Sequence, residues 1–138
     1  MIYFRPIEDF EKTKSLIYKK TDGFKKGFLH TYDNEGFYSK VYKNCVHIMY
    51  VDEKQAGAAK GGVYTHFYGG CVKYNDRQYL LGVFCLDLSL LLCLLAVSLF
   101  GILIFDFEEA GFAILFYIFL LILDIKSIKV LREFLDTL

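Results

Sequence analysis

The sequence contains no tryptophan, a single proline and only four cysteines, and one long stretch of it has almost no charge. From Leu80 to Phe105 the only charged residue is Asp87. Residues 1–79, by contrast, contain thirteen Lys and Arg against nine Asp and Glu, a net charge of +4. The chain therefore joins a mildly basic part to a nearly uncharged part, which is the usual composition of a membrane-anchored domain.

Motifs that carry catalysis or cofactor binding are also missing. The glycine-rich segment 57–62 lacks the G-x4-G-K-[ST] order of a phosphate-binding loop. There is no nucleophile elbow and no metalloprotease helix, and His30, His47 and His66 are scattered singly. No nucleic-acid recognition motif accompanies the basic residues. The sequence predicts a protein that is not an enzyme, needs no cofactor and binds no nucleic acid.

Four residues of types that bind zinc occur in two short groups, Cys45-x-His47 and His66-x4-Cys71. Their spacing is not that of a zinc ribbon or finger, which would offer paired C-x2-C or H-x3-H elements. We therefore predict no metal site, and leave open whether the four side chains converge on adjacent strands. Cys45 and Cys71 are expected to be free thiols, because the topology predicted below places them on a reducing face.

The uncharged stretch predicts a two-helix transmembrane hairpin. As a helix, segment 80–105 would be about 39 Å long, enough to cross a hydrocarbon core of about 30 Å. The apolar run 110–123 is shorter and on its own could be re-entrant, but its helical pattern continues, so we expect a second span over 110–128. The turn at 106–111 is acidic, and the positive-inside rule then places both termini on the cytoplasmic, or matrix-like, side. The expected protein is an integral, multi-pass membrane protein.

Polar and small residues within the predicted hairpin are candidate functional positions. Asp87 either marks a pathway or partner or lies at the membrane interface. Asp124 is expected at a comparable depth, and Lys126 can pair with either carboxylate. Small residues let helices approach closely, and a stripe of them is expected to contact the second helix or a neighbouring subunit: Cys85, Ser89, Cys93 and Gly101.

Residues 1–79 predict a domain on the cytoplasmic side, built as a small antiparallel β domain with an N-terminal helix. The helix is expected over 6–20, with the proline at its first position. Strands follow from residue 27 onward, with hairpin turns at 33–36 and 74–77. Period-two alternation places Cys45, His47 and Met49 on one face of a strand and Val46, Ile48 and Tyr50 on the other. The fold class is therefore α+β, with residues 80–138 as a separate membrane part.

Two further groups suggest binding surfaces. A basic run that could face anionic lipid comprises Lys12, Lys14, Lys19, Lys20, Lys25 and Lys26. An amphipathic C-terminal extension carries an apolar stripe at 3-4-3 spacing: Ile128, Leu131, Leu135 and Leu138. This stripe could dock on the chain's own sheet, lie on the bilayer, or bind a partner helix.

Together these features predict a non-enzymatic accessory or structural subunit of a larger membrane complex. Its expected partners are membrane lipids and other membrane-protein subunits, or further copies of itself. One alternative is a membrane-anchored module that reads anionic lipid through its basic N-terminal region. Another is an oligomeric ion or small-molecule conduit that involves Asp87.

Overall fold

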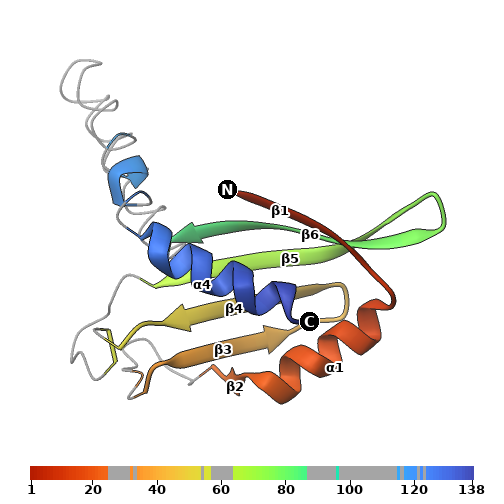
Figure 1. The fold of residues 1–138 in the computed structure, drawn as a ribbon, viewed down its shortest axis with the longest axis horizontal. Helices are drawn as coiled ribbons and strands as arrows, with labels where there is room; N and C mark the ends of the chain where they lie inside the picture. The colour runs from red at the N-terminus through yellow and green to blue at the C-terminus, as the bar shows by residue number, and fades with distance from the viewer. Residues whose placement is uncertain are drawn as a thin grey trace.

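The computed structural model of the chain describes residues 1–24, 32, 34–53, 55–56, 64–86, 96, 115, 117–120, 122 and 124–138. These residues form a six-stranded sheet that has helices α1 and α4 on the same face (Figure 1). The elements are β1 (Ile2–Ile7), α1 (Phe10–Lys20), β2 (Asp22–Gly23), β3 (Gly36–Val41), β4 (Cys45–Val51), β5 (Thr65–Tyr74), β6 (Arg77–Leu86) and α4 (Ile125–Asp136).

In space the strands lie in the order β1-β6-β5-β4-β3-β2. Strands β3 to β6 form an antiparallel meander, and β1 closes the other edge by pairing antiparallel with β6. Because β2 runs parallel to β3, the sheet is mixed rather than purely antiparallel. The first strand of the chain thus depends on the sixth for its backbone hydrogen bonds.

The β5–β6 hairpin has a two-residue turn at Asn75 and Asp76, as the sequence predicts for 74–77. Both residues have positive φ, 47° and 58°, which is the backbone of the type I′ turns that suit the twist of antiparallel strands. The two strands stay in register along their whole length, so the glycine pair 69–70 forms no bulge.

Phe67 explains two of the glycines in this hairpin. Gly69 and Gly82 lie directly opposite each other on β5 and β6, and the Phe67 ring lies over both. A Cβ at Gly82 would be 2.4 Å from the ring and 2.5 Å from the Tyr68 carbonyl oxygen. The fully buried Phe67 therefore requires glycine at this crossing of the strands.

Helix α1 begins later than its predicted start at residue 6, because residues 2–7 are taken by β1. Asp9 is the N-cap, and its side chain accepts hydrogen bonds from the backbone N–H groups of Glu11 and Lys12. Phe10 and Ile17 then face the sheet and are buried. The first turn of the helix is thus fixed by a side-chain cap rather than by the proline.

The main core lies between the two helices and one face of the sheet. It joins α1 and α4 to alternate residues of β1, β4, β5 and β6: Tyr3, Phe10, Ile17, Val46, Ile48, Tyr50, Phe67, Leu80, Phe84, Ile128, Leu131 and Leu135. The predicted alternation of β4 is confirmed, because Val46, Ile48 and Tyr50 face this core while Met49 belongs to a cluster on the other face.

That second cluster covers part of the opposite face, over β3 and β4. It consists of Tyr32, Tyr38, Met49, Val51 and Tyr64, with Phe24 and Ala56 packed against it. It does not include any residue of β1 or β6. Among the described residues, this cluster therefore covers the opposite face at its β3–β4 end only.

Side chains of β1 tie this edge strand to the end of α4. The Tyr3 hydroxyl donates to the Asp136 carboxylate at 2.9 Å, and Arg5 donates to the Leu135 carbonyl at 2.9 Å. Burial, and then the hydrogen bond to Asp136, raise the pKa of Tyr3 to about 12. The hydroxyl therefore stays protonated and able to donate over the whole physiological range.

The predicted two-helix transmembrane hairpin is wrong. Its first helix was expected to begin at residue 80, but residues 80–86 belong to β6, paired with β1 on one side and β5 on the other. None of the helices in the described ranges is long and apolar enough to cross a membrane. This finding contradicts the predicted integral, multi-pass location with both termini on the cytoplasmic side.

The reason for the error is that β6 is apolar on both of its faces. A strand of this kind has no alternation, and a continuous apolar run cannot be distinguished from a helix by periodicity alone. The boundary predicted between residues 79 and 80 falls inside β6, and α4 packs on the same sheet as β1. Of the predicted hairpin, residues 87–95, 97–114, 116, 121 and 123 lie outside the described residues.

Candidate functional site

At its β1–β6–β5 end, the face of the sheet opposite α1 and α4 carries an apolar patch. The patch is made by Ile2 and Phe4 on β1, Val72 on β5, and Tyr79, Leu81 and Val83 on β6. Strand register brings these side chains together. Ile2 lies opposite Val83, Phe4 opposite Leu81, and Tyr79 opposite Val72. Successive side chains of a strand point to opposite faces, so all six point away from α1 and α4.

The patch is exposed to an unusual degree for apolar side chains. Ile2 is 74% exposed, Phe4 59%, Val83 46% and Leu81 39%. An antiparallel sheet with one face on the core normally presents polar side chains on the other. Single exposed apolar residues are ordinary, but a contiguous group of them marks an interaction surface.

Aromatic stacking orders one end of the patch. The rings of Phe4 and Tyr79 are stacked, with centroids 4.7 Å apart and an angle of 9° between their planes. Next to Leu81, Gly70 on β5 has no side chain, and a Cβ added there would lie 3.2 Å from the Asn44 carbonyl oxygen. The aromatic pair is therefore the ordered part of the patch.

Charge is nearly absent from this region. Among the side chains of β1, β5 and β6 that share the face of the patch, Arg77 is the only one that carries a formal charge at neutral pH. It lies at the far end of β6, beside the hairpin turn. The patch is therefore suited to an apolar partner surface rather than to an ionic ligand.

A histidine pair lies on the same face between the patch and the second cluster. His47 Nε2 and His66 Nδ1 are 2.8 Å apart and share a hydrogen bond. The His47 ring also stacks on Tyr68, with centroids 4.0 Å apart, and contacts the Phe24 ring at 4.7 Å. The direct bond between the two rings occupies one nitrogen of each, which fixes the pair as a link between β4 and β5.

The four candidate zinc ligands divide between the two faces of the sheet. Cys71 faces the helices, where its Sγ lies 3.7 Å from the Gln78 side-chain oxygen, whereas His47 and His66 share the opposite face. Cys45 is exposed. In the part of the chain that the structure describes, no three His, Cys, Asp or Glu side chains group closely enough to hold a metal ion.

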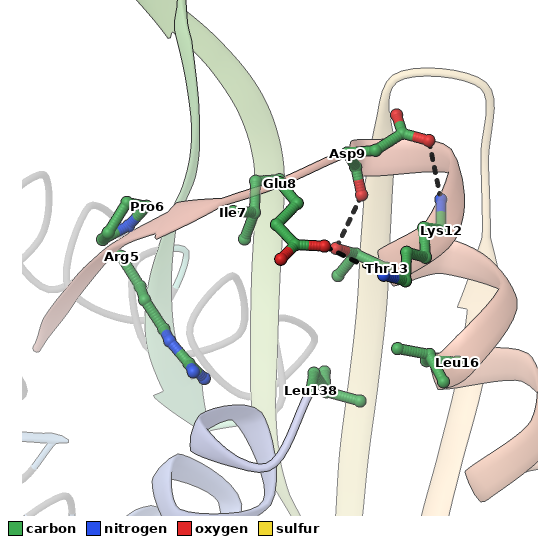
Figure 2. Close-up of a pocket in the computed structure, with 9 residues that line it drawn as sticks. All are labelled: Arg5, Pro6, Ile7, Glu8, Asp9, Lys12, Thr13, Leu16 and Leu138. Atoms are coloured by element: carbon green, nitrogen blue, oxygen red, sulfur yellow. Dashed lines mark hydrogen bonds and ion pairs between the residues drawn. The ribbon is translucent and has the colours of Figure 1, made fainter.

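A cavity of about 370 Å³ opens where β1 passes into α1 (Figure 2). Its charged groups are engaged with the protein itself. Glu8 and Lys12 form an ion pair at 2.9 Å, Asp9 caps α1, and Arg5 donates to the end of α4. A ligand pocket needs a few polar groups aimed at the ligand, and this cavity does not supply them from the residues that line it.

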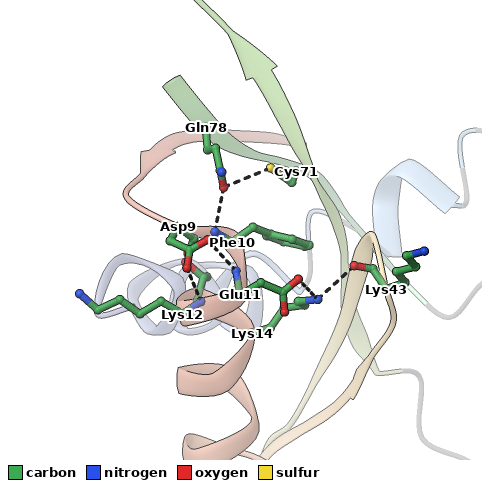
Figure 3. A network of polar contacts seen from close by, with 9 residues as sticks. Asp9, Phe10, Glu11, Lys12, Lys14, Lys43, Cys71 and Gln78 are labelled. Carbon is green, nitrogen blue, oxygen red and sulfur yellow. Dashed lines mark hydrogen bonds and ion pairs between the residues drawn. The ribbon is translucent and has the colours of Figure 1, made fainter. Parts of the chain in front are cut away.

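A second cavity, of about 400 Å³, lies beside the polar network in Figure 3. The Gln78 side-chain oxygen accepts from the Phe10 backbone N–H at 2.8 Å and contacts Cys71, so it joins the β5–β6 hairpin to α1. Lys14 donates to the Lys43 carbonyl at 3.1 Å and joins α1 to the β3–β4 turn. These bonds hold the helix on the sheet, so we interpret the network as structural.

The basic run on α1 is partly neutralised. Lys12 pairs with Glu8, and Lys14 pairs with Glu11 at 2.6 Å. Lys20 donates to a backbone carbonyl just beyond α4. The Lys12–Glu8 pair is exposed and therefore weak, whereas the Lys14 side chain is only 12% exposed. Both pairs lower the positive potential that an anionic surface would meet.

The remaining lysines of the run are Lys19, Lys25 and Lys26. Lys19 is exposed on α1, while Lys25 and Lys26 lie outside the described residues.

Asp124 is the N-terminal flanking residue of α4, and the Thr65 hydroxyl donates to its carboxylate. Burial raises the pKa of Asp124, the charge of Asp52 raises it further, and a hydrogen bond from Ser127 opposes both effects. Lys126, the predicted ion-pair partner, is exposed. The carboxylate therefore has hydroxyl partners at the end of the sheet.

The predicted helix-packing stripe is described at one position only. Cys85 lies in β6, on the face of the apolar patch, and is half-buried. Ser89, Cys93 and Gly101 lie outside the described residues, as does Asp87.

The C-terminal apolar stripe docks on the chain's own sheet, one of the three arrangements left open by the sequence. Ile128, Leu131 and Leu135 are buried in the main core, and Leu138 packs against it. Phe134 extends this contact by stacking on Phe37 of β3, with ring centroids 4.1 Å apart. These residues are therefore occupied within the chain.

The apolar patch itself was not identified from the sequence. The signal was present in the runs IYF (2–4) and YLLGVFCL (79–86), in which the residues that face either side of a strand are almost all apolar. A strand with one buried face would alternate with polar residues. Two such runs that pair with each other indicate a sheet with two apolar faces, only one of which the helices cover.

Comparison with known proteins adds no relative: no family model, no curated protein sequence and no solved structure matches the chain.

Proposed function

We propose that the chain is a non-enzymatic binding subunit, which packs its apolar patch against a partner protein in a larger assembly. The observation that carries this proposal is the exposure of Ile2, Phe4, Leu81 and Val83 side by side on one face. Leaving such a surface in water is unfavourable, at roughly 25 cal/mol for each Å² of apolar area. A partner that covers the patch removes this cost.

The two cavities support a binding role rather than catalysis. Both are lined by side chains that cap α1 or hold it on the sheet, and neither brings together a nucleophile, a base and a group to orient it. The apolar patch, by comparison, belongs to neither core cluster formed by the residues that the structure describes. A role as an accessory or structural subunit accounts for a sheet that presents one apolar surface.

The alternative function, in which the basic run binds anionic lipid, has weaker support. Lys12 and Lys14 are paired with acidic neighbours on the same helix, and α1 lies on the opposite side of the sheet from the apolar patch. The two surfaces therefore cannot contact one flat membrane together. Transport through a conduit would depend on Asp87, which lies outside the described residues.

A photo-crosslinking experiment tests the proposal in the cells that make the protein. A photoreactive phenylalanine analogue is placed at Phe4 in the patch or, as a matched control, at Tyr18. Tyr18 is also an exposed aromatic residue, 77% exposed, but it lies on α1. We expect illumination to give discrete protein adducts from position 4 and none from position 18.

Adducts that form equally from both positions would reflect random encounter and would count against a specific patch. A chain that gives no protein adduct from position 4, under conditions where the analogue is incorporated and the chain is folded, would remove the proposal.

A further inference from the structure

The partner of the apolar patch can be specified further. We infer that it is the same patch on a second copy of this chain, in a two-fold dimer with the two sheets face to face. This inference rests on the proposed function, because it names the partner that the patch binds. Its evidence is the charge, shape and area of the patch.

Charge favours a second copy over a partner with a charged surface. The face of the patch carries one formal charge on β1, β5 and β6, at Arg77, and that residue lies at the periphery beside the turn. Charged residues on a different partner would be buried without a counter-charge, which is costly. A second copy brings the same nearly uncharged surface, so packing the two together leaves the buried centre without unpaired charge.

The shape of the patch suits a two-fold interface. Its six side chains lie on one face of three neighbouring strands, so a copy rotated about a two-fold axis presents the same apolar face. Two-fold interfaces use one surface twice in this way, and apolar sheets pack face to face about 10 Å apart.

The exposed area is close to what a stable dimer needs. Given the exposed fractions above and ordinary side-chain sizes, the patch presents on the order of 500 Å² of apolar surface in each copy. A standard protein interface buries about 800 Å² per partner, and part of that is a polar rim. The patch therefore supplies an apolar centre of the right size, which neighbours such as Tyr74, 66% exposed, would surround.

The test uses the full chain in two forms that carry different affinity tags and are made in the same cell. The photoreactive analogue is placed at Phe4 in one form only. We expect illumination to give an adduct that contains both tags and has the mass of two chains. The control with the analogue at Tyr18 should give no adduct of this kind.

A substitution then measures how much the patch contributes. Leu81→Asp puts a charge at the centre of the patch and should weaken self-association by about 30-fold or more, as expected for a central interface residue. Tyr18→Asp, an equal change of charge on α1, should leave it unchanged. Self-association of both variants is measured by sedimentation over a range of protein concentration, and circular dichroism confirms that they are folded. If Leu81→Asp is unfolded, Val83→Lys takes its place.

The outcomes separate this inference from the proposed function. An adduct of position 4 with a different protein would overturn the two-fold dimer and leave the binding role intact. An adduct with lipid alone, or no adduct, would overturn both. A doubly tagged adduct, together with weaker association of the Leu81 or Val83 variant, supports both the dimer and the proposed function. If the patch variants associate as strongly as the parent chain, the dimer is overturned.

Discussion

The two faces of this sheet are built from similar residues and differ in what covers them. On one face, Leu80 and Phe84 of β6 are buried beneath α1 and α4. On the other, their sequence neighbours Leu81 and Val83 remain in contact with solvent. Hydrophobic sequence alone therefore does not say which face forms the core. That is decided by where the helices dock, and the second face keeps exposed apolar side chains on β1 and β6.

The largest expected effect is a difference in stability loss between an alanine substitution in the main core and one in the patch. Leu131→Ala removes a fully buried α4 side chain from the main core and should lower the free energy of unfolding by about 2–5 kcal/mol. Leu81→Ala, in the patch, should lower it by less than about 1 kcal/mol, because its side chain is already partly in water.

Denaturant unfolding checks this pair of variants at one low protein concentration, so that association through the patch does not add to the measured stability. Equal losses for the two variants would show that the patch is already buried within the folded monomer, and the contrast between the faces would disappear.

A second change tests how tightly the covered face is packed. In Gly82→Ala, the new methyl group would overlap the Phe67 ring and the Tyr68 carbonyl oxygen. Overpacking of this kind typically costs about 1–3 kcal/mol, and the backbone contact leaves little room for relief. The melting temperature measures the loss.

Gly23→Ala is the control, because nothing lies within 4 Å of its added Cβ. If the two alanine variants melt together, the Phe67 ring has moved aside and the packing is looser than the structure indicates.

The smallest expected effect is the pH dependence of the free energy of unfolding that Asp124 causes. The pKa of Asp124 is raised above its ordinary value of 3.8, chiefly by burial, so folding favours the protonated carboxyl. The stability that this group contributes is complete below the ordinary value and is lost as the pH rises through the raised one. Asp124→Asn, which stays neutral, should therefore unfold at neutral pH with a free energy equal to or higher than that of the parent chain, within about 1 kcal/mol.

Urea unfolding of this variant from pH 3 to pH 7 checks the sign. Its advantage over the parent chain should grow as the pH rises. An advantage that grows toward low pH would mean that the charged carboxylate stabilises the fold.

Local features of this fold follow from local sequence signals. The alternation in 45–51 predicts which residues of β4 face the core, and the Asn75–Asp76 turn carries the residues that tolerate positive φ. What could not be predicted depends on pairing over long distances. The run 80–86 has no period, so only its pairing with β1 and β5 shows that it is a strand.

The candidate site was missed for the same reason. Ile2 and Phe4 join the patch only because β1 lies beside β6, more than seventy residues later in the sequence. Conversely, the stripe that includes Leu131 was recognised as apolar, but its partner could not be chosen among three surfaces without the structure. Periodicity identifies an apolar side chain, and tertiary contact decides what it meets.

The hydrogen bonds from Tyr3 and Arg5 to the end of α4 have a consequence for how the chain is made. Strand β1 leaves the ribosome early, but its neighbour β6 and its anchor on α4 are synthesised only much later. Contacts between such distant residues form slowly, and during that wait an apolar edge strand is open to wrong pairing. Nascent chains of this protein should therefore depend on chaperones until α4 has emerged.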